Sequence, residues 1–383
     1  MTTSDLTPIP PRVQSERSTQ PYRIDFALIV LTGNLTRYLL TRPIVDRDPT
    51  VKARWYPIRT WVMDDPLRFL PGALRVRARH MLDSWRLYIR PPADAIVIHA
   101  FETYYLYALL KVLLRRDTII IKNPDGGISS EQGGLSGWLT ALAVRQTDLF
   151  VPWSHFAATR IKQAFPHVRD EQFLVLHPGI DLARWPQRPA REPGDRFKLL
   201  FVGGDLMRKG ADTLLDAFEQ HLDDSYDLHI ATQSGYLPPE IKSRIERLPR
   251  VTLHLDLPSN SPGLRQLFHS SDAFVLPTNN DVSSWVALEA MATGIPVVIT
   301  PQGGITDIVC DGETGLLIPP RDPAAIADAV NRLHTSPALR YKLTVQGRAH
   351  VETNYDAVKN TGQLLVTVKA LIDARRAQRK KVT

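Results

Sequence analysis

The sequence contains almost no cysteine, since Cys310 is the single thiol among 383 residues. One thiol cannot support an internal disulfide framework, which argues for a reducing compartment. Long apolar runs are missing as well, because none approaches the roughly 20 residues that span a bilayer. The first twenty residues are rich in Pro, Ser and Thr and lack the apolar stretch of a secretory signal. We therefore expect a cytoplasmic protein in which residues 1–20 form a flexible tail.

The composition does not fit a disordered chain, and the length does not fit a single small domain. Hydrophobic residues make up 43% of the chain and charged residues 23%, as in soluble globular proteins. A length of 383 residues suits two domains. Lysine and arginine outnumber aspartate and glutamate, 47 against 40. That surplus favours an anionic small molecule, an anionic membrane face or nucleic acid as a partner, without choosing among them.

Short apolar runs alternate along the chain with longer amphipathic runs. The short runs consist almost entirely of apolar residues, which is typical of parallel strands buried on both faces. In the first half we predict strands at residues 26–31, 95–100, 118–123, 149–153 and 173–179. Helices are predicted between them, for instance at residues 105–116 and 154–165.

A segment rich in Pro and Arg, residues 183–197, separates the two halves and is predicted to be a linker. The alternation of strands and helices then restarts. The expected fold class is α/β, with two Rossmann-like doubly wound parallel sheets that face an interdomain cleft. We place the first domain at 21–185, the second at 186–355, and a last helix at 356–383 that packs back across the junction.

Three constellations in the second half carry chemistry. In the first, a strand ends at Gly203 and Gly204, and Arg208 and Lys209 come just before a helix. Glycine lets a ligand approach the backbone closely, and cations beside a helix N-terminus favour a phosphate. An ordinary strand-to-helix turn with solvated Arg and Lys side chains is the alternative.

The second constellation is the stretch from Asp281 to Glu289. Its Asp and Ser residues predict the N-cap of a helix whose first amides, at Ser284, Trp285 and Val286, can bind an anion. Glu289 lies more than one turn further into an apolar run, where an unpaired carboxylate costs on the order of several kcal/mol. It therefore needs hydrogen-bond donors. A ribose diol can supply two, and a buried Arg or a backbone amide is the alternative.

The third constellation is Gly303 and Gly304, which follow a strand predicted at residues 296–300. Open α/β sheets bind their ligands at the carboxyl ends of the strands. All three constellations occupy such ends. Together they predict one pocket for a nucleotide diphosphate.

By their motifs, these segments resemble a known family. FVGGDLMRKG, LEAMATGIPVV and GGITDIVCDGETGLLIPP, with Asp281 and Glu289 separated by seven residues, closely resemble the retaining GT-B glycosyltransferases of family 4. The resemblance runs from residue 149 through the second half and is weaker before residue 145. It implies two Rossmann-like domains, of which the second holds a nucleotide-sugar donor and the first holds most of the acceptor. It also implies transfer with retention, no metal requirement and no cofactor besides the nucleotide-sugar co-substrate.

The resemblance implies roles for individual residues as well. Arg208 and Lys209 resemble the pair that neutralises the donor diphosphate, and Glu289 resembles the acid that binds the ribose hydroxyls. Asp281 stands beside the donor sugar, where the family more commonly has Glu. The mechanism implied is a front-face route, in which the leaving diphosphate helps to deprotonate the acceptor hydroxyl and the protein contributes positioning and charge stabilisation.

The first half departs from the family pattern. The family usually has a His after a first-domain strand, near the donor sugar, but here the matching strand leads to Lys122, Asn123 and Asp125. His99, at the end of an earlier strand, is a candidate substitute, although a lone His at a strand end is more often structural. Gly33 alone stands where the family often has several glycines. We therefore take His99 and Asn123 as candidate catalytic residues, and Gly33 and Asp125 as candidate acceptor-side residues.

A basic segment, residues 67–90, mixes six arginines with Leu, Phe, Met, Trp and Tyr. Such a segment can lie on an anionic membrane surface, where several family members use lipid-linked acceptors. A solvated helix face beside the cleft is the alternative. No known reading element accompanies the arginines, so nucleic acid is not expected as a partner. The acceptor is expected to be a glycan, a lipid-linked molecule or a small molecule.

Two other functions are open from the sequence. A catalytically silent GT-B protein that only binds a nucleotide or a glycan fits the unusual KNPDGG stretch. A dinucleotide-dependent oxidoreductase has similar Rossmann-like halves. It requires G-x-G-x-x-G after the first strand, however, and LTGNLTRY lacks that motif.

Overall fold

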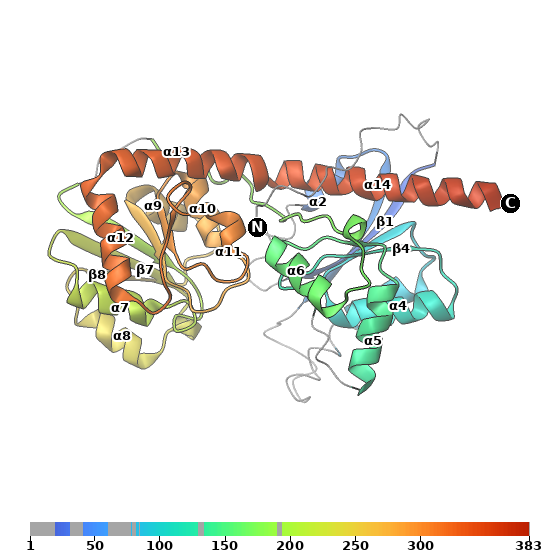
Figure 1. Cartoon of the computed structure of the whole chain (residues 1–383), viewed down its shortest axis with the longest axis horizontal. Coiled ribbons are helices and arrows are strands. Elements are labelled where there is room, and N and C mark those ends of the chain that lie inside the picture. The colour runs from blue at the N-terminus through green and yellow to red at the C-terminus, as the bar shows by residue number, and fades with distance from the viewer. Residues whose placement is uncertain are drawn as a thin grey trace.

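The computed structural model describes residues 20–30, 41–59, 78, 82–83, 85–128, 134–189 and 194–382. They form two α/β lobes, each built on one sheet (Figure 1). The first sheet contains β1 (Tyr22–Val30), β2 (Val51–Arg59), β3 (Ala95–Ile98), β4 (Ile119–Lys122) and β5 (Leu149–Phe150). The second contains β6 (Phe197–Val202), β7 (Tyr226–Thr232), β8 (Val251–Leu255), β9 (Ala273–Leu276), β10 (Val297–Ile299) and β11 (Leu316–Leu317).

Helices cover both sheets, which explains why the central strands are almost entirely apolar. Strands β3, β4 and β9 are buried along their whole length, as expected when both faces are covered. The first lobe carries α2 (Thr41–Asp46), α4 (Phe101–Leu113), α5 (Gly134–Arg145), α6 (His155–Ala164) and the short 3₁₀ helix η1 (Asp170–Gln172). The second carries α7 (Ala211–Gln220), η2 (Ser234–Tyr236), α8 (Pro239–Glu246), α9 (Pro262–Ser270), α10 (Trp285–Thr293), α11 (Ile305–Ile308) and α12 (Pro323–Thr335). Among the residues described, no helix is long and apolar enough to cross a membrane.

All strand pairs named in the two sheets are parallel, which confirms the predicted fold class. The strand order is β2-β1-β3-β4-β5 in the first lobe and β11-β10-β9-β6-β7-β8 in the second. In the second sheet the order reverses between β6 and β9, which pair at Leu199 with Ala273 and Leu200 with Phe274. Doubly wound sheets bind ligands at such a switch point. A ligand site is therefore expected at the loops that follow β6 and β9.

Two details of the first half differ from the prediction. The predicted strand at 173–179 is wrong: the segment forms an isolated bridge from Phe173 to Phe150 and donates two backbone hydrogen bonds, from Leu174 and Leu176, but it does not form a strand of the sheet. Strand β2 was not predicted. It pairs with β1 over nine residues and forms the edge of the sheet. An edge strand is only partly covered, so Lys52 and Arg54 interrupt the apolar run that marks a central strand.

The segment predicted to be a linker, 183–197, is partly built into the second lobe over its described residues. Trp185 is 2% exposed and packs edge-on against Phe268, with ring centroids 5.1 Å apart. Its indole N–H donates a hydrogen bond of 2.9 Å to Asn260 Oδ1. This connection is therefore anchored at the second lobe.

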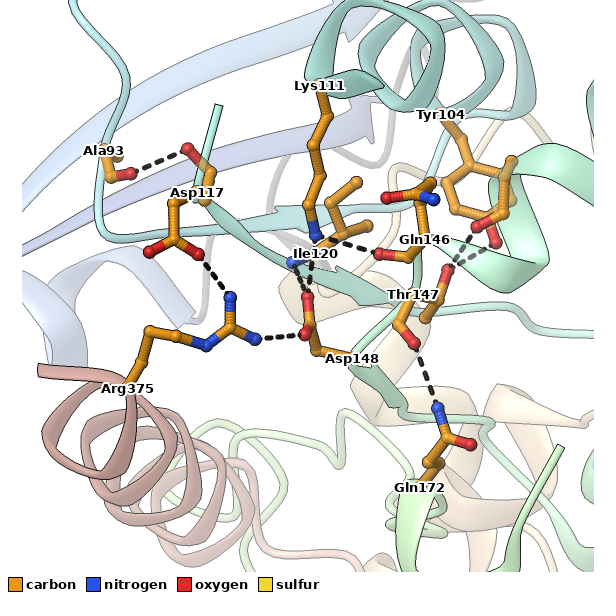
Figure 2. A network of polar contacts seen from close by, with 12 residues as sticks. Ala93, Tyr104, Lys111, Asp117, Ile120, Gln146, Thr147, Asp148, Gln172 and Arg375 are labelled. Carbon is orange, nitrogen blue, oxygen red and sulfur yellow. Dashed lines mark hydrogen bonds and ion pairs between the residues drawn. The ribbon is translucent and has the colours of Figure 1, made fainter. Parts of the chain in front are cut away.

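The two last helices run in sequence across both lobes (Figure 1). Helix α13 (Pro337–Asn354) packs on α10 of the second lobe, and α14 (Ala357–Val382) lies along the first. Figure 2 shows how α14 is held: Arg375 donates hydrogen bonds to Asp117 (2.5 Å) and Asp148 (2.6 Å). Asp148 also accepts bonds from Lys111 (3.1 Å) and from the Ile120 amide (2.8 Å). The exact domain boundaries remain predictions.

Candidate functional site

The loop after β6 reaches toward the exit of β9. Gly210 ends it with φ of 76° as the N-cap of α7. A Cβ at this position would lie 2.0 Å from the carbonyl oxygen of Pro277, which follows β9. Only glycine fits so close to a neighbouring backbone in the left-handed region. The two loops at the switch point are therefore packed directly against each other.

Two cations of this loop meet the loop after β9. Lys209 forms an ion pair with the Asp281 carboxylate, and their side chains are 12% and 10% exposed. Arg208 is more exposed, and it donates hydrogen bonds to the Asn280 carbonyl (2.8 Å) and to Asp205 (3.3 Å). The structure thus brings Arg208 and Lys209 close to Asp281, which lies more than 70 residues later in the sequence. An anion that entered here would share Lys209 with Asp281.

Helix α10 begins where the sequence predicts. Ser284 is its N-cap, with extended backbone, and its Oγ accepts a hydrogen bond of 3.3 Å from the Ala287 amide. The first amides of a helix have no partner inside the helix and carry the positive end of its dipole. In α10 these amides, at Trp285 and Val286, lie in the first turn directly after the loop that holds Asp281. This arrangement suits an anion beside Lys209.

Glu289 lies in the second turn of α10 and is 2% exposed. Its neighbours in the helix, Leu288 and Ala290, are fully buried. The acid therefore lies in an almost wholly buried stretch of α10. Its assignment to the ribose hydroxyls stays a prediction.

The structure gives Gly303 and Gly304 a packing role. Gly303 has φ of 59°, and a Cβ there would lie 2.1 Å from the Asp281 carbonyl oxygen. The Gly304 amide donates a hydrogen bond of 2.9 Å to the Val282 carbonyl. A Cβ at Gly304 would also lie 2.7 Å from Ser154, the N-cap of α6 in the first lobe. The glycines thus let three segments meet, and their contact with a donor stays a prediction.

In the first lobe, His99 and Lys122 lie side by side at the ends of β3 and β4. Lys122 is fully buried, donates a hydrogen bond to the His99 carbonyl, and lies 4.1 Å from the Phe101 ring centroid. Burial and, secondly, the charge of Lys122 lower the pKa of His99 to about 4. The His99 imidazole is therefore neutral at physiological pH.

Asn123 and Asp125 occupy the loop after β4. The Asn123 side chain donates to the Val151 carbonyl (3.2 Å) and accepts from the Trp153 indole (2.7 Å), so it fixes the segment after β5. Asp125 accepts a hydrogen bond of 2.8 Å from the Gly126 amide. Gly126 faces the second lobe, where a Cβ would lie 3.4 Å from Val282. The Asp125 loop therefore faces the Asp281 loop across the interface.

Some predicted residues lie outside the described residues. Gly33 is one of them, and so is most of segment 67–90, of which 78, 82–83 and 85–90 are described. In the described part, Trp85 and Ile89 are exposed, and the Arg86 guanidinium lies 5.5 Å from the Trp85 ring centroid.

Two contacts between the lobes involve residues that sequence reasoning missed. His177 Nε2 and Ser283 Oγ are 2.9 Å apart. Asp307 accepts a hydrogen bond of 2.5 Å from the His155 amide at the start of α6. The sequence signal for His177 is the motif His-Pro-Gly at 177–179, which falls at the end of the strand predicted at 173–179.

Comparisons with known proteins support the resemblance to glycosyltransferases. The model of the family described as Glycosyl transferases group 1 matches residues 196–336. The "Glycogen synthase" of Mycobacterium tuberculosis (strain ATCC 25618 / H37Rv) is 30% identical over 312 residues, which cover 77% of this chain and 72% of that protein. The "D-inositol 3-phosphate glycosyltransferase" of Arthrobacter sp. (strain FB24) is 33% identical over 180 residues. That match covers 43% of this chain and 42% of the relative.

Solved structures match nearly the whole chain. Anabaena HepE superposes with a TM-score of 0.68 at 17% identity and covers 91% of this chain and 100% of HepE. The sucrose-phosphate synthase of Thermosynechococcus elongatus reaches a TM-score of 0.70 at 19% identity, with 91% and 100% coverage. At these identities the likeness shows that the two-lobed fold is shared.

Proposed function

This chain belongs to the glycosyl transferases group 1 family, and on that premise we propose that it is a retaining, metal-independent glycosyltransferase. It moves a sugar from a nucleotide-diphosphate sugar to an acceptor hydroxyl. The observation that carries the proposal is the meeting of Arg208, Lys209 and Asp281 at the switch point between β6 and β9. The comparisons support glycosyl transfer, and these residues support the finer assignment.

The donor diphosphate belongs between the loop after β6 and the start of α10. Arg208 and Lys209 supply two positive charges there, and the first amides of α10 supply hydrogen-bond donors. These groups offset the charge of the leaving diphosphate without a divalent cation. Glu289, further along the same helix, takes the ribose hydroxyls.

In the transfer step, the bond between the anomeric carbon and the diphosphate oxygen breaks. The acceptor oxygen forms its bond on the same face, and the leaving diphosphate accepts the acceptor's proton. Preorganised cations next to the departing oxygen stabilise the charge that develops there. Asp281 lies beside Lys209 and contacts the donor sugar, and its shorter reach selects among sugars.

The acceptor belongs on the first lobe, near Asn123 and Asp125, whose loop faces Val282 across the interface. A glycan, a lipid-linked molecule and a small molecule all remain acceptor candidates. The exposed Trp85 and Ile89 beside Arg86 support peripheral binding of segment 67–90 to an anionic membrane. Sedimentation with vesicles of anionic against neutral lipid tests this part.

The experiment is a thermal-shift panel of UDP-, GDP- and ADP-sugars, followed by mass spectrometry of products with candidate acceptors. UDP-glucose comes first, because a structure of HepE is a complex with UDP-glucose. NMR of the product tests retention, and activity that persists in EDTA tests metal independence. Donor binding without hydrolysis or transfer would instead indicate a catalytically silent protein.

A further inference from the structure

His177 lies where the chain crosses between the lobes. The chain leaves the first lobe just after this residue and returns at Tyr355 and Asp356. The two crossings are hydrogen-bonded, since the Ile180 amide donates to the Tyr355 carbonyl (2.8 Å) and the Ala357 amide to the Ile180 carbonyl (3.0 Å). A Cβ at Gly179, which has φ of 76°, would lie 2.6 Å from the Tyr355 carbonyl oxygen. The turn that carries His177 is therefore fixed.

The hydrogen bonds of His177 define its tautomer. The Gly179 amide donates to Nδ1 over 2.9 Å, so Nδ1 carries no proton. The proton of the neutral ring is then on Nε2, which donates to Ser283 Oγ over 2.9 Å. Burial lowers the pKa of His177 to about 3, which keeps the ring neutral and this donor in place throughout the physiological range.

The His177 ring is enclosed by groups from every part of the junction. Its centroid lies 4.9 Å from that of Trp285 in α10 and 5.7 Å from that of Trp153 in the first lobe. Tyr355, on the return crossing, packs edge-on at 5.3 Å. The His177 carbonyl accepts a hydrogen bond of 2.8 Å from Asn360. Its imidazole therefore has little freedom to move away from Ser283.

Ser283 is part of the segment that carries the donor-site groups. It lies two residues after Asp281 and directly before Ser284, the N-cap of α10. A shift of Ser283 therefore changes both the reach of Asp281 and the direction of the first amides of the helix. From this geometry we propose that His177 is a positioning residue, which holds the loop between β9 and α10 in its donor-binding conformation against the first lobe. The proposal rests on the proposed function for its consequence in catalysis.

A double-mutant cycle tests the pair. The variants are His177→Phe, which keeps a ring against Trp285, Ser283→Ala and the double variant. His177→Gln, which retains an N–H donor, serves as the rescue. Each single variant should raise the donor KM about tenfold, the order expected for the loss of one hydrogen bond, and leave the acceptor KM unchanged. The double variant should be no worse than the worse single variant, because both remove the same contact.

A matched control separates this contact from general packing at the junction. His350→Phe makes the same chemical change beside the same tyrosine, with ring centroids 5.5 Å apart, but His350 faces the Asp307 carbonyl and not Ser283. We expect its donor KM to stay at the wild-type value. Additive effects in the cycle, or a wild-type donor KM in folded Ser283→Ala, would overturn the proposal.

Hydrogen exchange of the free protein tests the positioning without any donor. Peptides that cover residues 277–290 should exchange faster in His177→Phe and in Ser283→Ala than in wild type, because the loop and the start of α10 open more often. Unchanged exchange in both variants contradicts the role of His177 whatever the donor is. If wild type binds no nucleotide sugar while exchange responds as expected, the proposed function fails and the positioning role stands.

Discussion

Lys209 and Asp281 form an ion pair that joins the loop after β6 to the loop after β9. Both side chains are largely buried, so the pair is weakly screened by solvent. A diphosphate that binds beside Lys209 must compete with Asp281 for the same ammonium group. A change at either residue should therefore alter how the protein handles a nucleoside diphosphate.

We expect Lys209→Ala to reduce kcat by about 100-fold or more. The cation is lost where charge develops on the leaving diphosphate, and the loss of one such preorganised donor costs on this order. The measurement is steady-state turnover with the active donor. Lys242→Ala, an exposed lysine on α8, is the control, and urea unfolding of both variants checks for loss of fold. Wild-type turnover in Lys209→Ala contradicts the assignment.

Asp281→Asn should separate nucleotide affinity from turnover. The neutral amide no longer competes for Lys209, so we expect the free nucleoside diphosphate to bind severalfold more tightly. Turnover should fall, because the carboxylate contact with the donor sugar is weakened. Calorimetry of the nucleoside diphosphate and steady-state kinetics check the two effects. Weaker diphosphate binding in this variant contradicts the competition.

Gly210→Ala should destabilise the second lobe by about 2 kcal/mol or more. The new Cβ would lie 2.0 Å from the Pro277 carbonyl oxygen, at a residue with φ of 76°. Because the same contact positions the cation loop, donor affinity should fall as well. Gly235→Ala, where a Cβ meets nothing within 4 Å, is the matched control in urea unfolding. Equal stability of the two variants would falsify the close approach of the two loops.

Acid should destabilise the protein through His99 and His177. Burial lowers their folded-state pKa values to about 4 and about 3, below the value near 6.5 of an unfolded histidine. Well above pH 6.5 both histidines are neutral in the folded and in the unfolded chain, so their titration does not lower the free energy of unfolding. As the pH falls from there toward the folded pKa values, the unfolded state binds protons that the folded state does not. The free energy of unfolding therefore decreases, by up to about 1.4 kcal/mol per pH unit for each histidine.

Urea unfolding of wild type and His177→Phe between pH 7 and pH 4 isolates the part due to His177. The wild type should lose stability more steeply than the variant. Asp307, whose pKa burial raises, contributes equally to both proteins and cancels in the comparison. The same slope in both would show that His177 is protonated as easily in the folded chain as in the unfolded one.

Arg375→Ala should lower the free energy of unfolding by about 1–2 kcal/mol. It removes the hydrogen bonds to Asp117 and Asp148 that hold α14 on the first lobe (Figure 2). Asp148 keeps its bonds from Lys111 and Ile120, which limits the cost. Arg332→Ala, in an exposed pair on α12, is the control. An effect no larger than that of the control contradicts the docking role of Arg375.

The sequence predicted the second lobe more completely than the first, for a physical reason. Its inner strands β6, β9 and β10 are buried and nearly all apolar, and Gly203 and Gly303 follow strand ends, so strand pattern and turn chemistry agree. Strand β2 was missed because an edge strand carries polar residues. The contact of His177 with Ser283, 106 residues apart, depends on how the lobes approach each other. No local pattern encodes that approach.

The paired crossings have a mechanical consequence. Ile180 and Asp356 belong to the two chain segments that cross between the lobes, and these segments are hydrogen-bonded to each other. Two unbonded segments could twist or slide independently, whereas a twist or slide of one lobe against the other here has to break both hydrogen bonds. The paired crossings therefore stabilise the orientation in which the loops of Asp125 and Asp281 face each other.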